Sequence, residues 1–227
     1  RPGNEIVDHY TYVMCGDGDM MEGVASEAAS LAGHLALSRL TCIYDDNQIS
    51  IEGSTDIAFT EDVGQRFSAY KWHVVRVADG NDPAAIKTAL ADARNEKERP
   101  TLIMLRTKIA HGSPNKQGTA DAHGAPLGEA EIRLTKENLG MPDKPFYIPE
   151  QALAHMRACV AAGKSAEEAW KTRFAKYKGK YPKKAKALEG AINRILPLGW
   201  DADLDDLRNI EGPVATRAAS GKVLNAI

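Results

Sequence analysis

The stretch "MCGDGDMMEG", residues 14–23, places a carboxylate between two glycines where an apolar run ends and a helical pattern begins. Residues 10–15 form a short run rich in strand-favouring side chains, which predicts a buried strand. After this stretch the apolar side chains recur every three or four positions, at Met21, Val24, Ala25, Ala28, Leu31, Ala32 and Leu35. That spacing predicts a helix with one apolar face. Asp17 therefore stands between a predicted strand and a predicted helix.

The pattern of a strand followed by a helix is repeated further along the chain. Residues 40–44, 72–77 and 101–105 have the composition of strands, and residues 83–95 form a helical pattern that Asp82 opens. Strand–helix–strand units favour right-handed crossovers onto a parallel sheet. The sequence thus predicts an α/β fold, a parallel sheet flanked by helices, with ligands at the carboxyl ends of the strands.

The second half of the chain differs in character from the first. Residues 107–128 are polar and glycine-rich, and a long loop of this kind is usually functional or disordered. Residues 129–196 have a helical pattern, residues 197–213 resemble a linker, and residues 214–227 begin another helix. The lysine-rich run "KYKGKYPKKAK" lacks the interleaved stacking pattern of a nucleic-acid groove and is interpreted as a solvated helix surface.

Composition narrows the possible functions. The 227 residues are 43% hydrophobic, enough for a sizeable core, and the net charge of -2 attracts neither nucleic acid nor an anionic membrane. No apolar run is long enough to span a bilayer. Three cysteines, two of them in strand-like runs, favour a reduced, cytoplasmic setting. Because Arg1 is followed so closely by a strand pattern, we expect the chain to begin inside a larger protein.

Several familiar binding loops do not fit the residues around Asp17. A phosphate-binding P-loop needs a lysine after its second glycine, and residues 14–23 contain no basic side chain. A dinucleotide fingerprint needs a glycine where Met21 stands, and Asp17 would face the pyrophosphate with like charge. A calcium loop needs an oxygen ligand at that same position. A carboxylate can still meet phosphates through a bridging metal ion.

Magnesium suits such a bridge, because it takes one or two protein oxygens together with phosphate oxygens. A second ligand is expected at the end of the neighbouring strand, and Asn47 follows the strand predicted at 40–44. Taken singly, Asp17 could be a helix N-cap and Asn47 a turn residue. Their order and separation favour a shared site.

A strand ending in Gly-Asp-Gly, then a helix, then a strand ending in Asn resembles the thiamine diphosphate motif. Three stretches extend the likeness over most of the chain, and they resemble the transketolase family in particular: "GDGDMMEGVASEAASLAG", "YDDNQISIEG" and "GSPNKQGTADAHGAPLG". The resemblance implies thiamine diphosphate and Mg²⁺ as cofactors, with Ca²⁺ or Mn²⁺ as replacements for magnesium. It implies that residues 1–196 are the diphosphate-binding domain, incomplete at its start, with a helical tail from about 129. Residues 197–213 would be a linker, and residues 214–227 would begin the pyrimidine-binding domain.

The resemblance also assigns residues. Asp17, Asn47 and the backbone carbonyl of Ile49 would bind the metal. Asp17 would hold the cofactor through the metal, and Asn47 and Gly18 would also touch the diphosphate. The remaining cofactor contacts would come from Gly16, Ile109 and His123, although a core position at the end of a strand accounts for Ile109 nearly as well. His123 would contact both substrate and cofactor and move protons during catalysis.

Other positions refine this picture. The family places Glu22 at a dimer interface, beside the partner's catalytic glutamate. Two residues depart from the family pattern, Ala120 in place of a second histidine and His111 in place of a phenylalanine. We expect these departures to affect substrate preference more than the reaction.

The activity that the resemblance implies is ketol transfer. A two-carbon unit would pass from a ketose phosphate such as xylulose 5-phosphate to an aldose phosphate such as ribose 5-phosphate, in the pentose phosphate pathway or Calvin cycle. The enzyme would be a homodimer with its active site at the subunit interface. The alternatives are dihydroxyacetone synthase or another thiamine-dependent enzyme, and a noncatalytic cofactor-binding subunit. These residues alone are expected to be inactive, because the activating glutamate belongs to the pyrimidine-binding domain.

Overall fold

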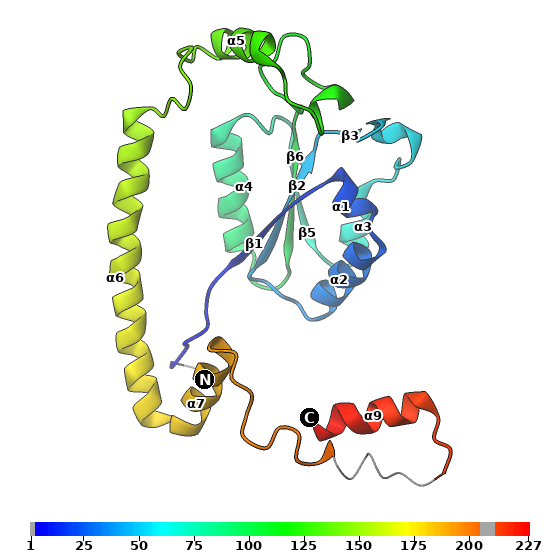
Figure 1. Ribbon diagram of the computed structural model, residues 1–227, viewed down its shortest axis with the longest axis vertical. Helices are drawn as coiled ribbons and strands as arrows, with labels where there is room; N and C mark the ends of the chain where they lie inside the picture. The colour runs from blue at the N-terminus through cyan, green and yellow to red at the C-terminus, as the bar shows by residue number, and fades with distance from the viewer. Residues whose placement is uncertain (1–2, 205–211) are drawn as a thin grey trace. The chain divides into compact units, whose positions relative to one another are not determined.

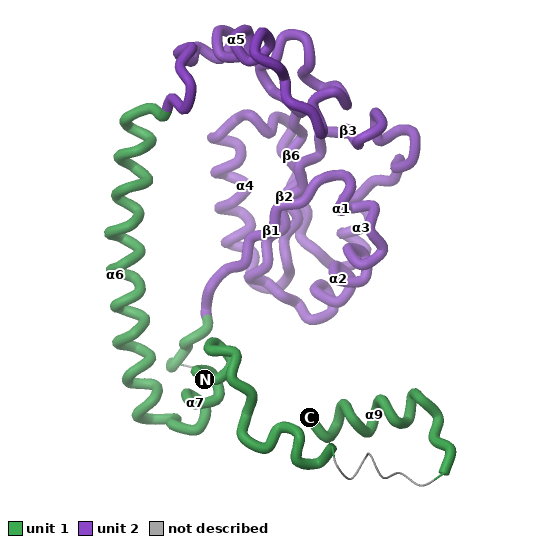
Figure 2. The backbone as a smooth tube through the Cα atoms, in the orientation of Figure 1, with its two compact units in different colours: residues 1–7, 148–227 green, residues 8–147 purple. Residues whose placement is uncertain are grey.

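The computed structural model describes residues 3–204 and 212–227. The chain divides into two compact units, one formed by residues 8–147 and the other by residues 1–7 with 148–227 (Figure 2). The first unit contains both sheets and every strand of the described residues, and the helices α6 (Glu150–Lys180), α7 (Pro182–Ile192) and α9 (Thr216–Ala226) lie in the second. Both the expected site and the expected sheet therefore belong to the unit 8–147.

A four-stranded parallel sheet forms the centre of the unit 8–147 (Figure 1). Its order is β1-β2-β6-β5, and every pair of neighbours is parallel. The strands are β1 (Thr11–Gly16), β2 (Leu40–Asp46), β5 (His73–Val77) and β6 (Thr101–Arg106). The α/β fold predicted from the strand and helix patterns is confirmed, and each of the four predicted strands lies within about a residue or two of its expected place.

Helices cover both faces of the sheet, and side chains alternate between the two faces along β6. Leu102 and Met104 join the core that packs under α2 (Gly23–His34) and α3 (Val63–Ala69). Ile103 points the other way and packs with Ala89 and Ala93 of α4 (Pro83–Asn95). A strand that is buried on both faces is typical of the interior of a parallel sheet. The three layers leave the strand ends free to build a site.

The helix caps show where the sequence pattern was informative and where it was not. The Asp82 carboxylate accepts a hydrogen bond from the Ala84 N–H at 2.8 Å, so α4 begins as predicted. Asp62 caps α3 in the same way, through the Gln65 N–H at 3.0 Å. The sequence pattern predicts no element over residues 49–71. In the structure this segment contains α3, the short helix η1 (Thr55–Ile57), and a hairpin of β3 (Ile49–Ser50) with β4 (Gly53–Ser54).

The helix predicted after Gly-Asp-Gly is divided in two. It forms α1 (Asp17–Met21) and α2, separated at Glu22, whose backbone is extended with φ -69° and ψ 132°. The predicted apolar face is also only partly buried, because Val24 is 68% exposed and Leu31 57% exposed. Small residues make the close packing instead, and a Cβ at Gly33 would stand 1.8 Å from the Tyr70 carbonyl oxygen.

The helical pattern predicted over residues 129–196 was wrong for part of its length. The chain forms α5 (Glu129–Asn138), α6 (Glu150–Lys180) and α7 (Pro182–Ile192). No helix is formed over residues 139–149, where Gly140 has a φ of 65° and three prolines interrupt the chain. Helix α5 belongs to the compact unit 8–147, so the helical unit starts near residue 148 rather than 129.

Aromatic and polar contacts hold the helical unit together. Trp170 and Phe174 stack on α6 with ring centroids 5.1 Å apart, and the Trp170 indole N–H donates to the Ile6 carbonyl at 2.9 Å. The predicted last helix is present as α9 (Thr216–Ala226). Residues 205–211, part of the predicted linker, lie outside the described residues. Among the described residues, no helix is both long and apolar enough to cross a membrane.

Candidate functional site

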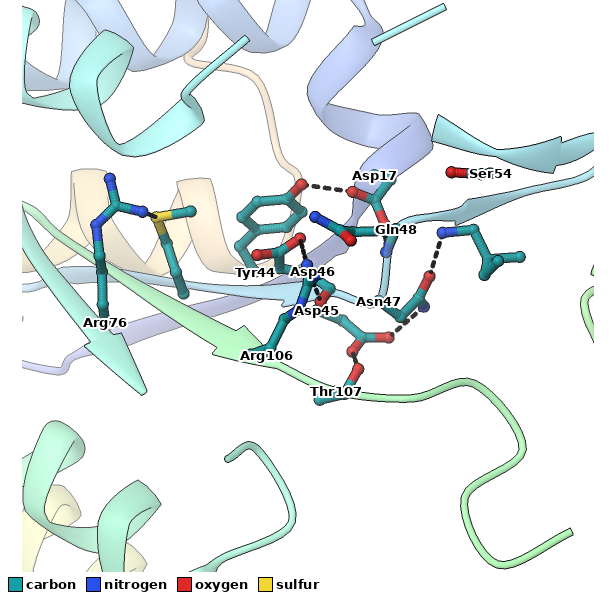
Figure 3. A network of polar contacts seen from close by, with 12 residues as sticks. Asp17, Tyr44, Asp45, Asp46, Asn47, Gln48, Ser54, Arg76, Arg106 and Thr107 are labelled. Atoms are coloured by element: carbon teal, nitrogen blue, oxygen red, sulfur yellow. Dashed lines mark hydrogen bonds and ion pairs between the residues drawn. The ribbon is translucent and has the colours of Figure 1, made fainter. Parts of the chain in front are cut away.

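The carboxyl ends of β1 and β2 meet at one edge of the sheet. The register pairs Gly16 with Asp45, which places Asp17 and Asn47 just beyond the ends of two neighbouring strands. Asp17 opens α1 and is 4% exposed, whereas Gly18 beside it is exposed. Figure 3 shows Asp17, Gln48 and Asn47 gathered at this edge. The expected pairing of the two motifs across adjacent parallel strands is therefore present in the fold.

Two neutral donors hold the Asp17 carboxylate. The Tyr44 hydroxyl donates to Oδ1 at 2.5 Å, and the Gln48 backbone N–H donates to Oδ2 at 3.0 Å (Figure 3). Burial and the hydrogen bond to Asp17 raise the pKa of Tyr44 above its ordinary value, so the phenol keeps its proton and remains a donor. Gln48 reaches Asp17 by adopting a left-handed backbone with φ 59°, which is uncommon for a residue other than glycine.

Asn47 is oriented by a second chain of contacts. Its Nδ2 donates to Asp45 Oδ2 at 3.0 Å, and its Oδ1 accepts the Ile49 N–H at 2.9 Å. The Thr107 hydroxyl, from the end of β6, donates to the other oxygen of Asp45. Because the amide nitrogen is committed to Asp45, the Asn47 oxygen is the atom left to act as a ligand.

The residues at this edge fit a hard divalent cation bound together with a phosphate group. Asp17 is buried, and within the described residues no lysine, arginine or histidine pairs with it. A buried carboxylate that has two neutral donors and no counter-charge is stabilised by a cation. A Cβ at Gly16 or Gly18 would meet no other atom within 4 Å, so a ligand can approach the backbone there.

Side chains alone do not form a complete metal site in the described residues. No group of three or more His, Cys, Asp or Glu side chains that could hold a metal exists in the described part of the chain. The set at this edge has one carboxylate, one amide and the Ile49 carbonyl. Magnesium accepts such a partial set, because phosphate and water oxygens complete its shell.

The loop after β6 carries Ile109 and His123, the two site residues predicted farthest along the chain. Ile109 is half-buried, and its carbonyl accepts the Gly118 N–H at 2.9 Å. His123 ends the short helix η2 (Ala120–Ala122) and is exposed. No hydrogen bond or ion pair joins either residue to Asp17 or Asn47. The parallel order of β1, β2 and β6 places all three strand ends at the same edge of the sheet.

Helix α5 holds that loop in place through Glu131. The Glu131 carboxylate, 8% exposed, accepts hydrogen bonds from the Ser113 hydroxyl and from the Asn115 N–H and side-chain amide, the last two at 2.9 Å. These donors, the Ser113 hydroxyl first, lower the pKa of Glu131 to about 2. The Asn138 amide also donates to the Gly112 carbonyl at 2.9 Å. The long loop is thus an ordered structure with its own anchor.

A polar cleft of about 430 Å³ lies between the loop and the ends of β2, β5 and β6. Asn47 lines it together with Thr107, Lys108 and His111. On the β2 side of the cleft, Arg106 forms an ion pair with Asp46 at 3.0 Å. Burial raises the pKa of Asp46, and the Arg106 guanidinium opposes that shift. The cleft therefore offers cationic and neutral donors next to Asn47.

Sequence interpretation missed Tyr44, Gln48 and Glu131. Tyr44 lies on β2, and alternation along that strand would place it on the same face as Cys42 without revealing that its hydroxyl reaches Asp17. Gln48 contributes a backbone N–H, which no side-chain pattern can show. Glu131 is 18 residues from Ser113 in the sequence. Its role could have been suspected because a helix opening directly after a polar loop places acidic residues near that loop.

Comparison with known protein families identifies the family of this chain. Residues 1–197 match the model described as "Transketolase, thiamine diphosphate binding domain". The chain belongs to this transketolase family. The sequence resemblance is thereby confirmed, and the family's description attributes thiamine diphosphate binding to the matched domain.

Individual proteins similar to this chain are also named transketolases. Transketolase from Geobacillus stearothermophilus is 50% identical over 229 residues, covering 100% of this chain and 34% of the relative. The solved transketolase from Leishmania mexicana superposes with a TM-score of 0.86 at 42% identity, covering 100% of this chain and 33% of that one. A transketolase from Pichia stipitis, solved in complex with sedoheptulose 7-phosphate, gives a TM-score of 0.82 at 44% identity and covers 89% of this chain and 30% of that one. The chain spans about a third of the length of these relatives.

Proposed function

We propose that this chain is the diphosphate-binding part of a transketolase, which transfers a two-carbon ketol group from a ketose phosphate to an aldose phosphate. The observation that carries the proposal is the buried Asp17 carboxylate, held by neutral donors beside Asn47, in a chain of the transketolase family. Sugar phosphates are supported as substrates by the Pichia stipitis relative solved with sedoheptulose 7-phosphate.

In this proposal Asp17, Asn47 and the Ile49 carbonyl hold Mg²⁺, with Ca²⁺ or Mn²⁺ able to replace it. Gly16 and Gly18 leave the backbone open to the diphosphate, because no side chain stands there. Thiamine diphosphate, when bound, supplies the carbanion chemistry, and the protein supplies placement and electrostatics. Tyr44 keeps the Asp17 carboxylate oriented, and its raised pKa keeps it a donor at neutral pH.

In the proposal, two residues of the loop after β6 contact the cofactor and the substrate. Ile109 would pack on the cofactor ring, and His123 would donate to substrate and diphosphate oxygens and move a proton near neutral pH. The exposure of His123 supports contact with an exchangeable ligand rather than a role in the core. Glu131 and Asn138 hold this loop through hydrogen bonds to Asn115 and Gly112.

The proposed assembly is a homodimer with its active site at the subunit interface. Residues 1–196 would form the diphosphate-binding domain, residues 197–213 a linker, and residues 214–227 the start of the pyrimidine-binding domain. The exposed apolar side chains of α2, among them Val24 and Leu31, and the neighbouring Glu22 support a partner surface there. The proposed location is the cytoplasm, which the three free cysteines support.

Calorimetric titration of the full-length protein with thiamine diphosphate, with and without Mg²⁺, tests the binding half of the proposal. Binding should require the metal and should be lost in Asp17→Asn. Asp92→Asn, the same charge change on the exposed surface of α4, is the matched control and should bind normally. Metal-independent binding in the unmodified protein would contradict the assignment.

A coupled assay with xylulose 5-phosphate and ribose 5-phosphate tests the activity. The full-length protein should turn over, and residues 1–227 alone should not, because half of the cofactor would lie in water without its activating carboxylate. Turnover by residues 1–227 alone would show that the activating carboxylate lies within them.

A further inference from the structure

Two cysteines lie directly behind the strand end that carries Asp17. Cys15 is on β1 and Cys42 on β2, and their Sγ atoms are 3.2 Å apart. The Cys15 sulfur also lies 3.6 Å from the Ile43 carbonyl oxygen. Both cysteines are free thiols. The sequence alone suggests two small apolar residues on neighbouring strands. The contact between their sulfurs means that the two thiols can react with each other.

The strand register determines how the two thiols could be joined. Cys42 is opposite Val13 and Cys15 is opposite Tyr44, so the cysteines are diagonal neighbours whose side chains share one face of the sheet. Parallel strands lie about 4.8 Å apart and rise about 3.3 Å per residue, so Cα atoms of such diagonal neighbours are roughly 8 Å apart, beyond the 4.4–6.8 Å that disulfides usually span. A bond between them therefore requires a small shift of one strand. A disulfide formed under such strain is easily reduced again.

The thiols can be reached by a small reagent. A cleft of about 320 Å³ between β1 and α2 is lined by both cysteines and by apolar side chains such as Met14, Met20 and Ala28. Cys15 is half-buried, and Cys42 is 8% exposed. A molecule of the size of hydrogen peroxide fits in a cleft of this volume.

We propose that Cys15 and Cys42 form a reversible redox site, in which a peroxide oxidises the two thiols to an intramolecular disulfide. One sulfur attacks a peroxide oxygen, so that an S–O bond forms, the O–O bond breaks and one water leaves after protonation. The second sulfur then attacks the first, the S–S bond forms, the S–O bond breaks and a second water leaves. Two thiols and one hydrogen peroxide thus give one disulfide and two waters.

The site has a consequence for the strand end. Cys15 is joined to Asp17 through Gly16 alone, so the strand shift needed for the bond is transmitted to the carboxylate. Thiamine diphosphate and Mg²⁺ should therefore bind about tenfold more weakly to the oxidised protein, the scale of change that follows when a ligand's support is altered. This consequence rests on the proposed function, whereas the thiol chemistry does not.

Peptide mapping of the full-length protein tests the thiol chemistry, because trypsin separates all three cysteines. Cys15 lies in the peptide that ends at Arg39, Cys42 in residues 40–66 and Cys159 in residues 158–164. After treatment with hydrogen peroxide and alkylation, we expect a linked pair of the first two peptides, lighter by two hydrogens than the sum of both. Dithiothreitol before alkylation should restore two separate alkylated peptides.

Cys159→Ala is the matched control, since Cys159 is exposed on α6 and its loss should leave the linked pair unchanged. Cys42→Ala should abolish the pair. Recovery of Cys15 and Cys42 as separate peptides from the oxidised protein, whether alkylated or over-oxidised, would overturn the redox site.

Calorimetry on the reduced and oxidised protein tests the consequence for binding. A weaker affinity after oxidation that dithiothreitol reverses, and that Cys42→Ala does not show, supports the coupling to Asp17. A linked pair with unchanged affinity would overturn that coupling. Failure of the reduced protein to bind thiamine diphosphate would instead contradict the proposed function and would leave the peptide result as it stands.

Discussion

The unit 8–147 buries two carboxylates, which differ in the number of hydrogen bonds that they accept. Asp17 is 4% exposed and accepts one hydrogen bond on each oxygen, from Tyr44 and Gln48. Glu131 is 8% exposed and accepts three, from Ser113 and Asn115. Three donors satisfy Glu131 and lower its pKa to about 2, which marks a structural anchor. Asp17 retains lone pairs and an uncompensated charge, which are the properties of a ligand.

The largest effect is expected when the charge of Asp17 is removed. Asp17→Asn in the full-length protein should weaken magnesium-dependent binding of thiamine diphosphate more than about 100-fold, beyond the loss typical for residues behind a ligand. The fold should persist, because the change removes a buried charge that has no partner of opposite sign within the described residues. Calorimetry and thermal unfolding measure the two quantities. Unchanged affinity would make Asp17 structural, like Glu131.

The next effect concerns His123, which lies in the loop that Glu131 anchors. His123→Ala should lower kcat/KM for ketol transfer about 100-fold, as expected for the loss of a proton-transfer group. The melting temperature should stay the same because the side chain is exposed. His155→Ala, which removes an exposed histidine from α6, is the control and should leave kcat/KM unchanged. Steady-state kinetics decide, and normal turnover would remove His123 from the proposed site.

A smaller effect on turnover, with a clear effect on stability, is expected from Glu131→Gln. The substitution replaces charge-assisted hydrogen bonds to Ser113 and Asn115 with weaker ones and turns an amide N–H toward other donors. The melting temperature should fall by several degrees, and amide hydrogen exchange should speed up over residues 112–117. Glu129→Gln, on the exposed surface of α5, is the control. If exchange in the loop is unchanged, Glu131 is not its anchor.

The smallest effect is the pH dependence of that anchor. The pKa of Glu131 is lowered from 4.5 to about 2 in the folded state, so the folded protein favours the ionised form. Its contribution to the free energy of unfolding is complete above pH 4.5 and decreases as the pH falls toward 2. Denaturant unfolding of the unmodified protein and Glu131→Gln should show a difference in stability that shrinks over this range. A difference that is constant with pH would mean that the charge contributes nothing.

Much of the fold could be predicted from the sequence, because the start and type of these strands and helices depend mainly on residues that are close together in the chain. Strand-favouring runs predicted the four parallel strands, and Asp82 followed by Pro83 predicted the start of α4. The pattern was wrong over residues 139–149, where a positive φ at Gly140 and three prolines outweigh the helical spacing. It also gave no signal for α3, a helix of 7 residues that is stabilised mainly by burying Val63 and Phe67.

For the site, the sequence by itself predicted Asp17 and Asn47 as the residues that would carry the chemistry, and it placed them at the ends of two neighbouring parallel strands, as the structure has them. This was possible because a strand–helix–strand unit allows essentially one crossover. Tertiary structure alone decided which partners each group meets. Tyr44 donates to Asp17, Asn115 donates to Glu131, and Cys15 meets Cys42 at 3.2 Å. Such contacts depend on register and on distances between segments remote in sequence, where a slip of one residue sends a side chain to the opposite face of the sheet.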